Sequence, residues 1–253
     1  MKIVSLNVEN GLHIERHMHF LREHEGDVYC FQEMPEPHLV QYQRELKCPF
    51  VSFVPLSIKF VPDVANVPEG LPVQWGIAII SKYELENSKQ HHIGAVGDTV
   101  PHFDHDIAFE LQQGSALQTA ELSIDGTRFT VGNVHFPRGG RGQDIMDYQR
   151  DSLLQLIAAM QTYEELVMAG DLNSPRRWEI FDTIAEHFTD NIPLSYPTTI
   201  DINLHKNGAK DPVGMSELVI DCLFTTPHYS VSNVVLFNGV SDHFAVTGDI
   251  TKH

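Results

Sequence analysis

The chain has 253 residues, of which 42% are hydrophobic and 20% charged, a composition that suits one globular domain with a sizeable core. Thirty-four acidic and seventeen basic residues give a net charge of −17, which disfavours indiscriminate binding of long nucleic acid, because such binding needs many lysine and arginine contacts to phosphates. No apolar run approaches the ~20 residues of a membrane span, and no signal peptide is visible. With an odd count of three cysteines, we expect a cytoplasmic single domain over 1–253, without a membrane or an obligate protein partner.

The first half of the chain predicts alternating strands and helices. Strands are expected over 2–8, 27–33, 50–54, 76–81 and 83–93, and helices over 14–24 and 38–47. The first helix carries several histidines, which we expect at its surface: His13, His17, His19 and His24. Residues 55–74 contain four prolines and no periodicity, which predicts a long loop.

The second half predicts a hairpin over 120–136, with Asp125 and Gly126 at its turn. A helix over 144–160, a buried strand over 166–169 and a helix from 176 to 186 follow. Residues 192–216 are rich in turn formers, and the last three strands are expected over 218–224, 230–237 and 244–250. Hairpins mixed with helices indicate an α+β fold, in which two packed mixed or antiparallel sheets are flanked by helices in a four-layer α/β sandwich.

Asp171 and Asn173 follow the apolar run 166–169, two residues apart. With the period of two in a strand, their side chains leave the backbone on one face. A carboxylate and a carboxamide side by side offer an oxygen ligand to a hard cation and a donor to a phosphate. The alternative is an ordinary turn, because Asp, Asn, Ser and Pro all favour turns.

Polar residues recur where other predicted strands begin or end: Asn7, Glu33, His135, Asp221, Asp242 and His243. Each has a structural explanation as a turn former, a solvated strand end or a core histidine. Asp221 is the least easily explained in this way, because an unpaired carboxylate in an apolar strand is costly. We expect His243 to be its partner.

The order and local contexts of these residues resemble the endonuclease/exonuclease/phosphatase superfamily. Seven segments carry the resemblance: Ser5-Leu6-Asn7-Val8-Glu9-Asn10, Phe31-Gln32-Glu33-Met34, Gly76-Ile77-Ala78-Ile79-Ile80-Ser81, Asn133-Val134-His135-Phe136, Gly170-Asp171-Leu172-Asn173, Ile220-Asp221 and Ser241-Asp242-His243. They span nearly the whole chain in the family's order. The resemblance implies a hydrolase for phosphoester bonds, foremost a Mg²⁺-dependent phosphodiesterase or nuclease that uses in-line water attack.

The resemblance also implies the metal ligands. Glu33 would be the main ligand of Mg²⁺, or of Mn²⁺ as a substitute, with Asn7 and Asp242 near the ion and Glu9 assisting. An all-oxygen shell of few carboxylates, completed by water and substrate phosphate, suits Mg²⁺.

The same resemblance implies the catalytic groups. His243 would act as general base or electrostatic partner, oriented by Asp221. Asp171 would align or deprotonate the attacking water, and Asn173 and His135 would donate hydrogen bonds to the phosphoryl oxygens.

The substrate is less defined by the sequence. Arg138, Arg141, Arg176 and Arg177 could contact phosphate and Trp178 could stack on a base, or these could be solvated loop arginines and a core aromatic residue. The phosphoester could be a nucleic-acid end or single strand. The alternatives are a phosphomonoesterase or phospholipase of the same fold, such as an inositol-phosphate or sphingomyelinase-like enzyme, and a catalytically silent phosphate-binding module.

Overall fold

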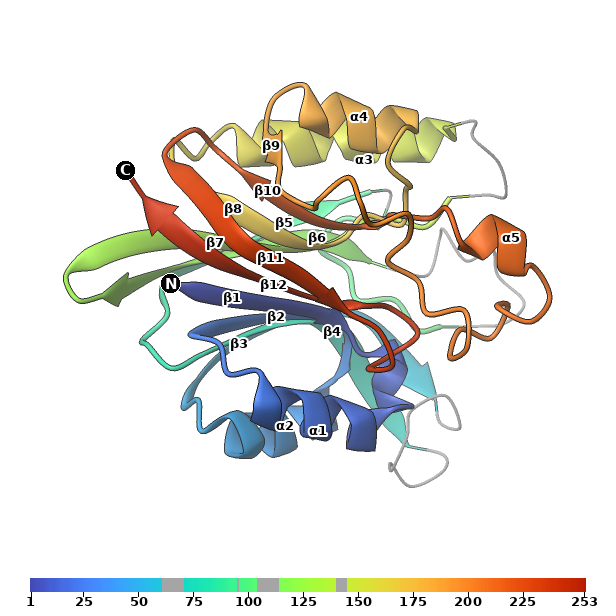
Figure 1. Cartoon of the computed structure of the whole chain (residues 1–253), viewed down its shortest axis with the longest axis horizontal. Coiled ribbons are helices and arrows are strands. Elements are labelled where there is room, and N and C mark those ends of the chain that lie inside the picture. Colours follow the sequence, from blue (N-terminus) through green and yellow to red (C-terminus); the bar gives the residue numbers. More distant parts are fainter. Residues whose placement is uncertain (61–70, 95, 104–113, 140–144) are drawn as a thin grey trace.

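The computed structural model describes residues 1–60, 71–94, 96–103, 114–139 and 145–253. Two six-stranded sheets pack face to face, with helices on both outer surfaces (Figure 1). The predicted four-layer α+β sandwich is thus confirmed. None of the helices in these residues is long and apolar enough to cross a membrane.

Each sheet combines antiparallel pairs with one parallel pair, β1 with β2 and β7 with β8. The first sheet, in the order β11-β12-β1-β2-β4-β3, contains β1 (Lys2–Asn7), β2 (Val28–Pro35), β3 (Phe50–Phe60), β4 (Pro72–Ser81), β11 (Tyr229–Phe237) and β12 (Ala245–Lys252). The second sheet, in the order β5-β6-β7-β8-β10-β9, contains β5 (Glu86–Ile93), β6 (Ser115–Ile124), β7 (Thr127–His135), β8 (Val167–Asp171), β9 (Thr189–Asp190) and β10 (Asp221–Thr225).

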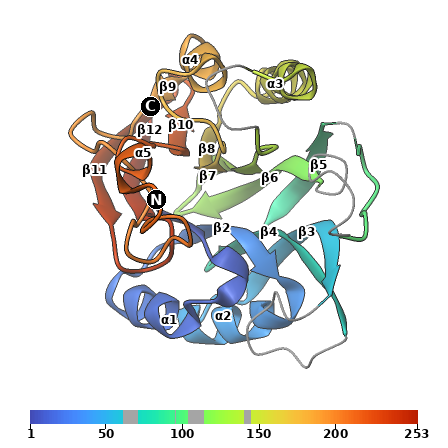
Figure 2. The ribbon, with the colours of Figure 1, turned by 90° about the vertical axis from the view of Figure 1, so that its right-hand side faces the viewer.

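Helices cover the outer face of each sheet (Figure 2). The first sheet is covered by α1 (Ile14–Glu23) and α2 (Leu39–Leu46), and the second by α3 (Asp147–Met160) and α4 (Glu179–Ala185). Three short helical segments lie in the connections: η1 (Glu9–Gly11), η2 (Glu36–His38) and α5 (Pro212–Met215).

Strand β2 shows why the sandwich has apolar layers on both faces of a sheet. Val28 and Cys30 pack in the layer between the two sheets, whereas Tyr29 and Phe31 pack in the layer beneath α1 and α2. Successive side chains of a strand point to opposite faces, so a strand that is covered on both sides must be apolar throughout. This requirement explains the continuous apolar run that predicted the strand.

The long loop predicted over 55–74 is wrong at both ends. Strand β3 continues to Phe60 and β4 begins at Pro72, while residues 61–70 lie outside the described part of the chain. Pro55 is accommodated because the pairing of β3 with β4 shifts register between Pro55 and Ser57, and Pro72 is the first residue of its strand. Proline lacks the N–H of a ladder hydrogen bond, so bulges and strand starts tolerate it.

His17 was expected at the surface of the first helix but is fully buried. Its Nδ1 lies 2.7 Å from the hydroxyl oxygen of Tyr42 on α2, and its Nε2 has no hydrogen-bond partner within the described residues. Burial, followed by the positive charges of His13 and His38, lowers the pKa of His17 to about 3. The folded protein therefore keeps this imidazole neutral.

We expect His17 to destabilise the fold in mild acid. Below pH 6.5, the ordinary pKa of histidine, the imidazole of the unfolded chain binds a proton, whereas His17 in the folded protein stays neutral down to about pH 3. The free energy of unfolding therefore falls as the pH decreases from 6.5 towards 3. The expected loss is about 2 kcal/mol between pH 7 and pH 5. In urea denaturation, His17→Gln should reduce the pH dependence by that amount, and His19→Gln, at an exposed position of the same helix, should not. If the pH dependence of stability is unchanged in His17→Gln, the buried imidazole of His17 is not its source.

Candidate active site

The ends of three neighbouring strands of the second sheet lie at one edge. Asp171, the last residue of β8, is paired with His135 at the end of β7 and with Asp221 at the start of β10. In the first sheet, Asn7 at the end of β1 is paired with Gln32 of β2. The two sets face each other, so most of the polar strand ends predicted from the sequence form one cluster.

Glu33 leaves the regular alternation of β2 through a bulge. The pairing of β2 with β4 shifts register between Phe31 and Met34, and Glu33 has a φ of 55°. A bulge re-aims a side chain and disrupts the local ladder. The side chain of Glu33 is 25% exposed, and its Oε2 accepts a hydrogen bond of 3.4 Å from Asn10 Nδ2. The carboxylate is thus accessible to solvent at the edge of an otherwise buried cluster.

Asn7 connects the first sheet to the second. Its Nδ2 donates to Asp171 Oδ2 at 3.0 Å, and its Oδ1 accepts from the backbone N–H of Glu9 at 3.0 Å. An amide oxygen has two lone pairs, so Oδ1 can still serve a cation. Glu9 begins η1, and its Oε2 lies 3.1 Å from His13 Nε2.

His135 and Asn173 flank Asp171 on the second sheet. His135 Nε2 lies 3.7 Å from Asp171 Oδ2 and 3.9 Å from Glu33 Oε1. The backbone N–H of Asn173 donates to Asp171 Oδ1 at 2.7 Å, and its Nδ2 donates to the carbonyl of Phe136 at 3.0 Å. Asn173 has a φ of 49°, a conformation that asparagine tolerates better than most residues. Asn173 therefore lies in a turn after β8, the alternative that the sequence left open, and the prediction that it shares a strand face with Asp171 is wrong.

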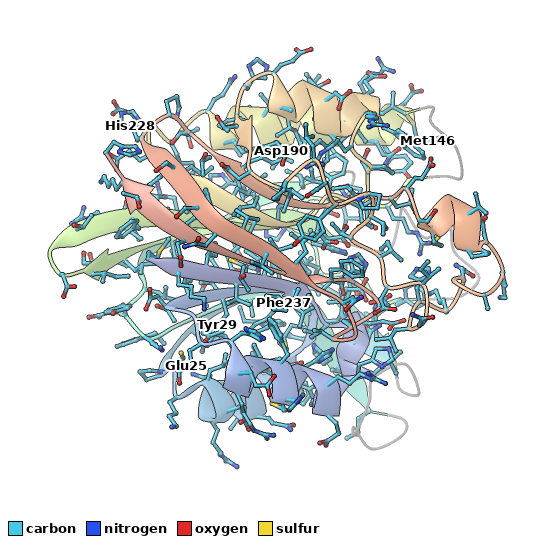
Figure 3. All side chains as sticks on the ribbon, viewed as in Figure 1. Glu25, Tyr29, Met146, Asp190, His228 and Phe237 are labelled. Atoms are coloured by element: carbon cyan, nitrogen blue, oxygen red, sulfur yellow. The ribbon has the colours of Figure 1, made fainter. Side chains whose placement is uncertain are left out.

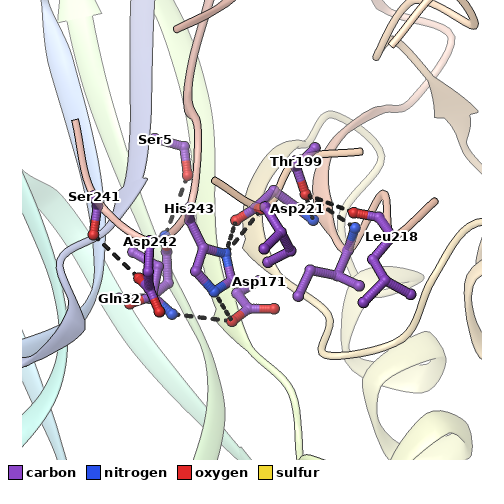
Figure 4. Close-up of polar contacts among 12 residues, drawn as sticks. Ser5, Gln32, Asp171, Thr199, Leu218, Asp221, Ser241, Asp242 and His243 are labelled. Carbon is purple, nitrogen blue, oxygen red and sulfur yellow. Dashed lines mark hydrogen bonds and ion pairs between the residues drawn. The ribbon is translucent and has the colours of Figure 1, made fainter. Parts of the chain in front are cut away.

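His243 pairs with Asp221, as expected. His243 Nδ1 lies 3.1 and 3.0 Å from the two carboxylate oxygens of Asp221, and Nε2 lies 3.9 Å from Asp171 Oδ2 (Figure 4). The Thr199 hydroxyl accepts from the backbone N–H of Asp221 at 3.1 Å, and Ile200 forms a β-bridge with His243. These contacts hold the imidazole between two carboxylates, with Nε2 on the side of Asp171.

Three carboxylates from the first sheet and its loops repel one another. Burial, followed by the charges of Asp242 and Glu33, raises the pKa of Glu9 to about 8. Burial, with a contribution from Glu33, raises the pKa of Asp242 to about 6. Burial also raises the pKa of Glu33, but the positive charges of Lys59 and His135 outweigh it and hold that pKa below its ordinary value. Such mutual repulsion is relieved by a bound cation.

The electrostatics of His243 differ from those of an ordinary buried histidine. Burial lowers its pKa, but Asp221, Asp171 and Asp242 outweigh this effect and hold it well above its ordinary value. Atoms of Asp171, Asp221 and His243 also lie within 4.8 Å of one another, close enough to ligate a metal ion. Because both oxygens of Asp221 lie on His243 Nδ1, we interpret this group as a hydrogen-bonded acid–histidine pair rather than a metal cage.

The predicted substrate-binding residues do not share one environment. Arg176 is engaged internally: Nη2 lies 2.6 Å from Asp190 Oδ2 and donates to the Ile192 carbonyl at 2.8 Å. Asp190 belongs to β9 and is labelled in Figure 3. Arg138 and Arg177 are exposed, and Trp178 is half-buried at the start of α4. Arg141 lies outside the described residues.

Sequence reasoning missed two residues that support the site, Lys59 and Thr199. Lys59 donates to Asn10 Oδ1 at 3.1 Å and lies 3.8 Å above the ring of Trp75, which packs edge-on against His135. Lys59 lies in the segment that the sequence predicts as a loop, where no pattern distinguishes it. Thr199, whose hydroxyl holds the Asp221 backbone, lay in a segment identified only as rich in turn formers.

Comparison of the sequence with protein-family models and with curated proteins finds no match. Solved structures, in contrast, are similar over the whole chain. An endonuclease/exonuclease/phosphatase protein of Beutenbergia cavernae has a TM-score of 0.71 at 15% identity, covering 100% of this chain and 71% of the other. The mannosyl-6-phosphatase of Bacteroides thetaiotaomicron has a TM-score of 0.68 at 14% identity, and the match covers 99% of each chain.

The catalytic domain of human nocturnin, solved with a bound sulfate anion, is a third similar structure. It has a TM-score of 0.68 at 17% identity and covers 100% of this chain and 93% of the other. At these identities, the likeness is one of fold. The protein therefore has the endonuclease/exonuclease/phosphatase fold, as the resemblance of its seven sequence segments predicted.

Proposed function

We propose that the protein is a Mg²⁺-dependent phosphodiesterase that hydrolyses its substrate by in-line attack of water. The observation that carries this proposal is the meeting of two groups at one edge of the sandwich. Repelling carboxylates come from the first sheet and its loops, and a histidine between two carboxylates faces the second sheet. The first group suits a hard divalent cation and the second suits an oxyanion.

The donor set fits Mg²⁺. Glu33, Asp242, Glu9 and the amide oxygen of Asn7 would hold the ion, and all are oxygen donors. Burial first, and neighbouring carboxylates second, raise the pKa values of Glu9 and Asp242, and a bound cation would offset both effects. When bound, the ion would polarise the phosphoryl group and stabilise the leaving oxygen.

The remaining residues would act on water and on the phosphoryl oxygens. The Asp171 carboxylate, oriented by Asn7 and Asn173, would align the attacking water and accept its proton. His243, positioned by Asp221, would place a positive N–H near the oxygens as charge accumulates on them, and His135 would add a second donor. In-line attack requires such fixed donors more than a strong nucleophile.

The test is hydrolysis by the purified protein across a panel of phosphoesters. The panel contains bis-p-nitrophenyl phosphate, p-nitrophenyl phosphate, single- and double-stranded DNA, RNA and a 5′-tyrosyl oligonucleotide. We expect cleavage of a diester with Mg²⁺, complete loss with EDTA, and recovery when Mg²⁺ or Mn²⁺ is restored in excess. Turnover that persists in EDTA would contradict the metal requirement.

A phosphomonoesterase is the second candidate. The net charge of −17 favours a small phosphorylated substrate over a long polyanion, because nonspecific nucleic-acid binding depends on many cationic contacts. Hydrolysis of the monoester alone would replace the diesterase proposal with this one. Metal binding without turnover of any member of the panel would favour a silent phosphate-binding module.

A further inference from the structure

Two fully buried amide side chains form a hydrogen bond between the sheets, directly beneath the site. Gln32 Nε2 of β2 donates to Asn133 Oδ1 of β7 at 2.7 Å and also lies 3.2 Å from Ser5 Oγ. Asn133 Nδ2 in turn donates to the backbone carbonyls of Phe31 and Ala78, both at 3.0 Å. We call this set of contacts the amide bridge.

The amide bridge lies within an otherwise apolar layer. Around it pack side chains such as Cys30, Ala169 and Val131, which contribute to the core between the two sheets. Burying polar groups gives little net stability compared with apolar residues of similar volume, because their desolvation offsets the hydrogen bonds they form. Hydrogen bonds differ from apolar packing in being directional, with narrow ranges of distance and angle. The bridge can therefore specify a spacing that apolar packing would leave adjustable.

Both residues of the amide bridge lie close to active-site residues in the sequence. Gln32 immediately precedes Glu33 in the bulge of β2, and Asn133 lies two residues before His135 on β7. The two carbonyls that Asn133 holds belong to Phe31 and Ala78, the last paired residues before the β2–β4 register shifts. One bond thus connects the backbone that presents Glu33 to the backbone that presents His135.

We propose that Gln32 and Asn133 are positioning residues that set the spacing between the two halves of the active site. The bridge holds the bulge of β2 against β7, and so fixes Glu33 of the first sheet relative to His135 and Asp171 of the second. In its effect on catalysis this inference rests on the proposed function. Its geometric content, the 3.9 Å separation of Glu33 Oε1 from His135 Nε2, does not.

The kinetic test uses Gln32→Met, Asn133→Ser and the double variant. Methionine keeps the approximate volume of glutamine without its hydrogen bonds, and serine is too short to span the gap. We expect each single variant to lower kcat by at least about tenfold with little change in KM, since a misplacement of about 1 Å can cost about 10²-fold. The double variant should be no slower than the slower single variant, because both substitutions disrupt the same bridge.

Gln118 provides the matched control. It is also fully buried, and its Nε2 connects the sheets by donating to Ser52 Oγ at 2.8 Å, from β6 to β3. Neither strand carries a proposed metal ligand or catalytic side chain. Gln118→Met should therefore remove an inter-sheet hydrogen bond of the same kind and lower the free energy of unfolding, while leaving kcat within about twofold of the wild type.

Crystal structures of Gln32→Met, Asn133→Ser and Gln118→Met give a readout that needs no turnover. We expect the Glu33–His135 separation to change by more than about 0.5 Å in the bridge variants, a tolerance typical of catalytic geometry, and not in the control. An unchanged separation would overturn the inference, as would bridge variants whose kcat equals that of Gln118→Met. If the wild type hydrolyses no phosphoester, the proposed function fails, and the crystal structures alone decide on the bridge.

Discussion

Glu33→Gln is expected to lower kcat/KM by about 10³-fold, because a catalytic metal ion supplies several kcal/mol and each ~1.4 kcal/mol changes a rate tenfold. Glu33 is the carboxylate whose pKa the nearby Lys59 and His135 hold below its ordinary value, so it is ionised and available to a cation. Glutamine keeps the shape and one oxygen but removes the charge. The Mn²⁺ affinity, measured by titration with paramagnetic detection, should fall together with activity.

Glu36→Gln is the control for this change. Glu36 is exposed and lies three residues further along the chain, so its substitution removes the same charge from the protein without touching the site. Activity and Mn²⁺ affinity should match the wild type. Wild-type Mn²⁺ affinity in Glu33→Gln would show that Glu33 is not a metal ligand, whatever the effect on turnover.

Asp221→Asn is expected to lower kcat by about 10²–10⁴-fold while leaving the fold intact, in line with the loss of a carboxylate that orients a catalytic histidine. The Asp221 carboxylate accepts from His243 Nδ1 and contributes most to the raised pKa of His243. An amide can present its N–H₂ to Nδ1 instead, which would reverse the ring tautomer and leave the imidazole neutral. Steady-state kinetics and thermal unfolding of the variant check both parts.

A double variant tests whether Asp221 acts through His243. His243→Ala and the double variant with Asp221→Asn should have nearly equal kcat, because Asp221 acts through His243 and residues that act as a unit are not additive. Asp125→Asn, at the exposed turn between β6 and β7, is the matched control and should behave as the wild type. Multiplicative losses in the double variant would show that Asp221 acts independently, for example as a metal ligand within the Asp171–Asp221–His243 cluster.

Much of the fold could be predicted from local patterns. Strand β8 is a local feature, because it is a short apolar run, buried along its whole length, that ends on a carboxylate. The hairpin of β6 and β7 follows from alternation around Asp125 and Gly126, both with positive φ. The pairing of Asp221 with His243 could be predicted from the free-energy cost of burying a charge, because a carboxylate in an apolar strand requires a partner.

Other features depend on contacts that no local pattern contains. Asn7 and Asp171 are 164 positions apart and meet only because β1 and β8 lie in facing sheets. The helical pattern of α1 did not distinguish His17 from its exposed neighbours, because its burial depends on where α2 packs. Arg176 was a candidate for binding substrate until β9 placed Asp190 against it.

The sequence by itself determined most of the strands and helices, the polar character of the strand ends and the family that these segments resemble, since all of these depend on periodicity and residue type over a few neighbours; the extensions of β3 and β4 into the predicted loop are the exception. The tertiary structure alone decided which polar ends meet, at what spacing and in which charge state. Packing two sheets brings distant carboxylates together in a poorly hydrated place, and this raises the pKa of Glu9 to about 8 and holds the pKa of His243 above its ordinary value. Burial and charge proximity are properties of the packed sheets, and a single strand carries neither.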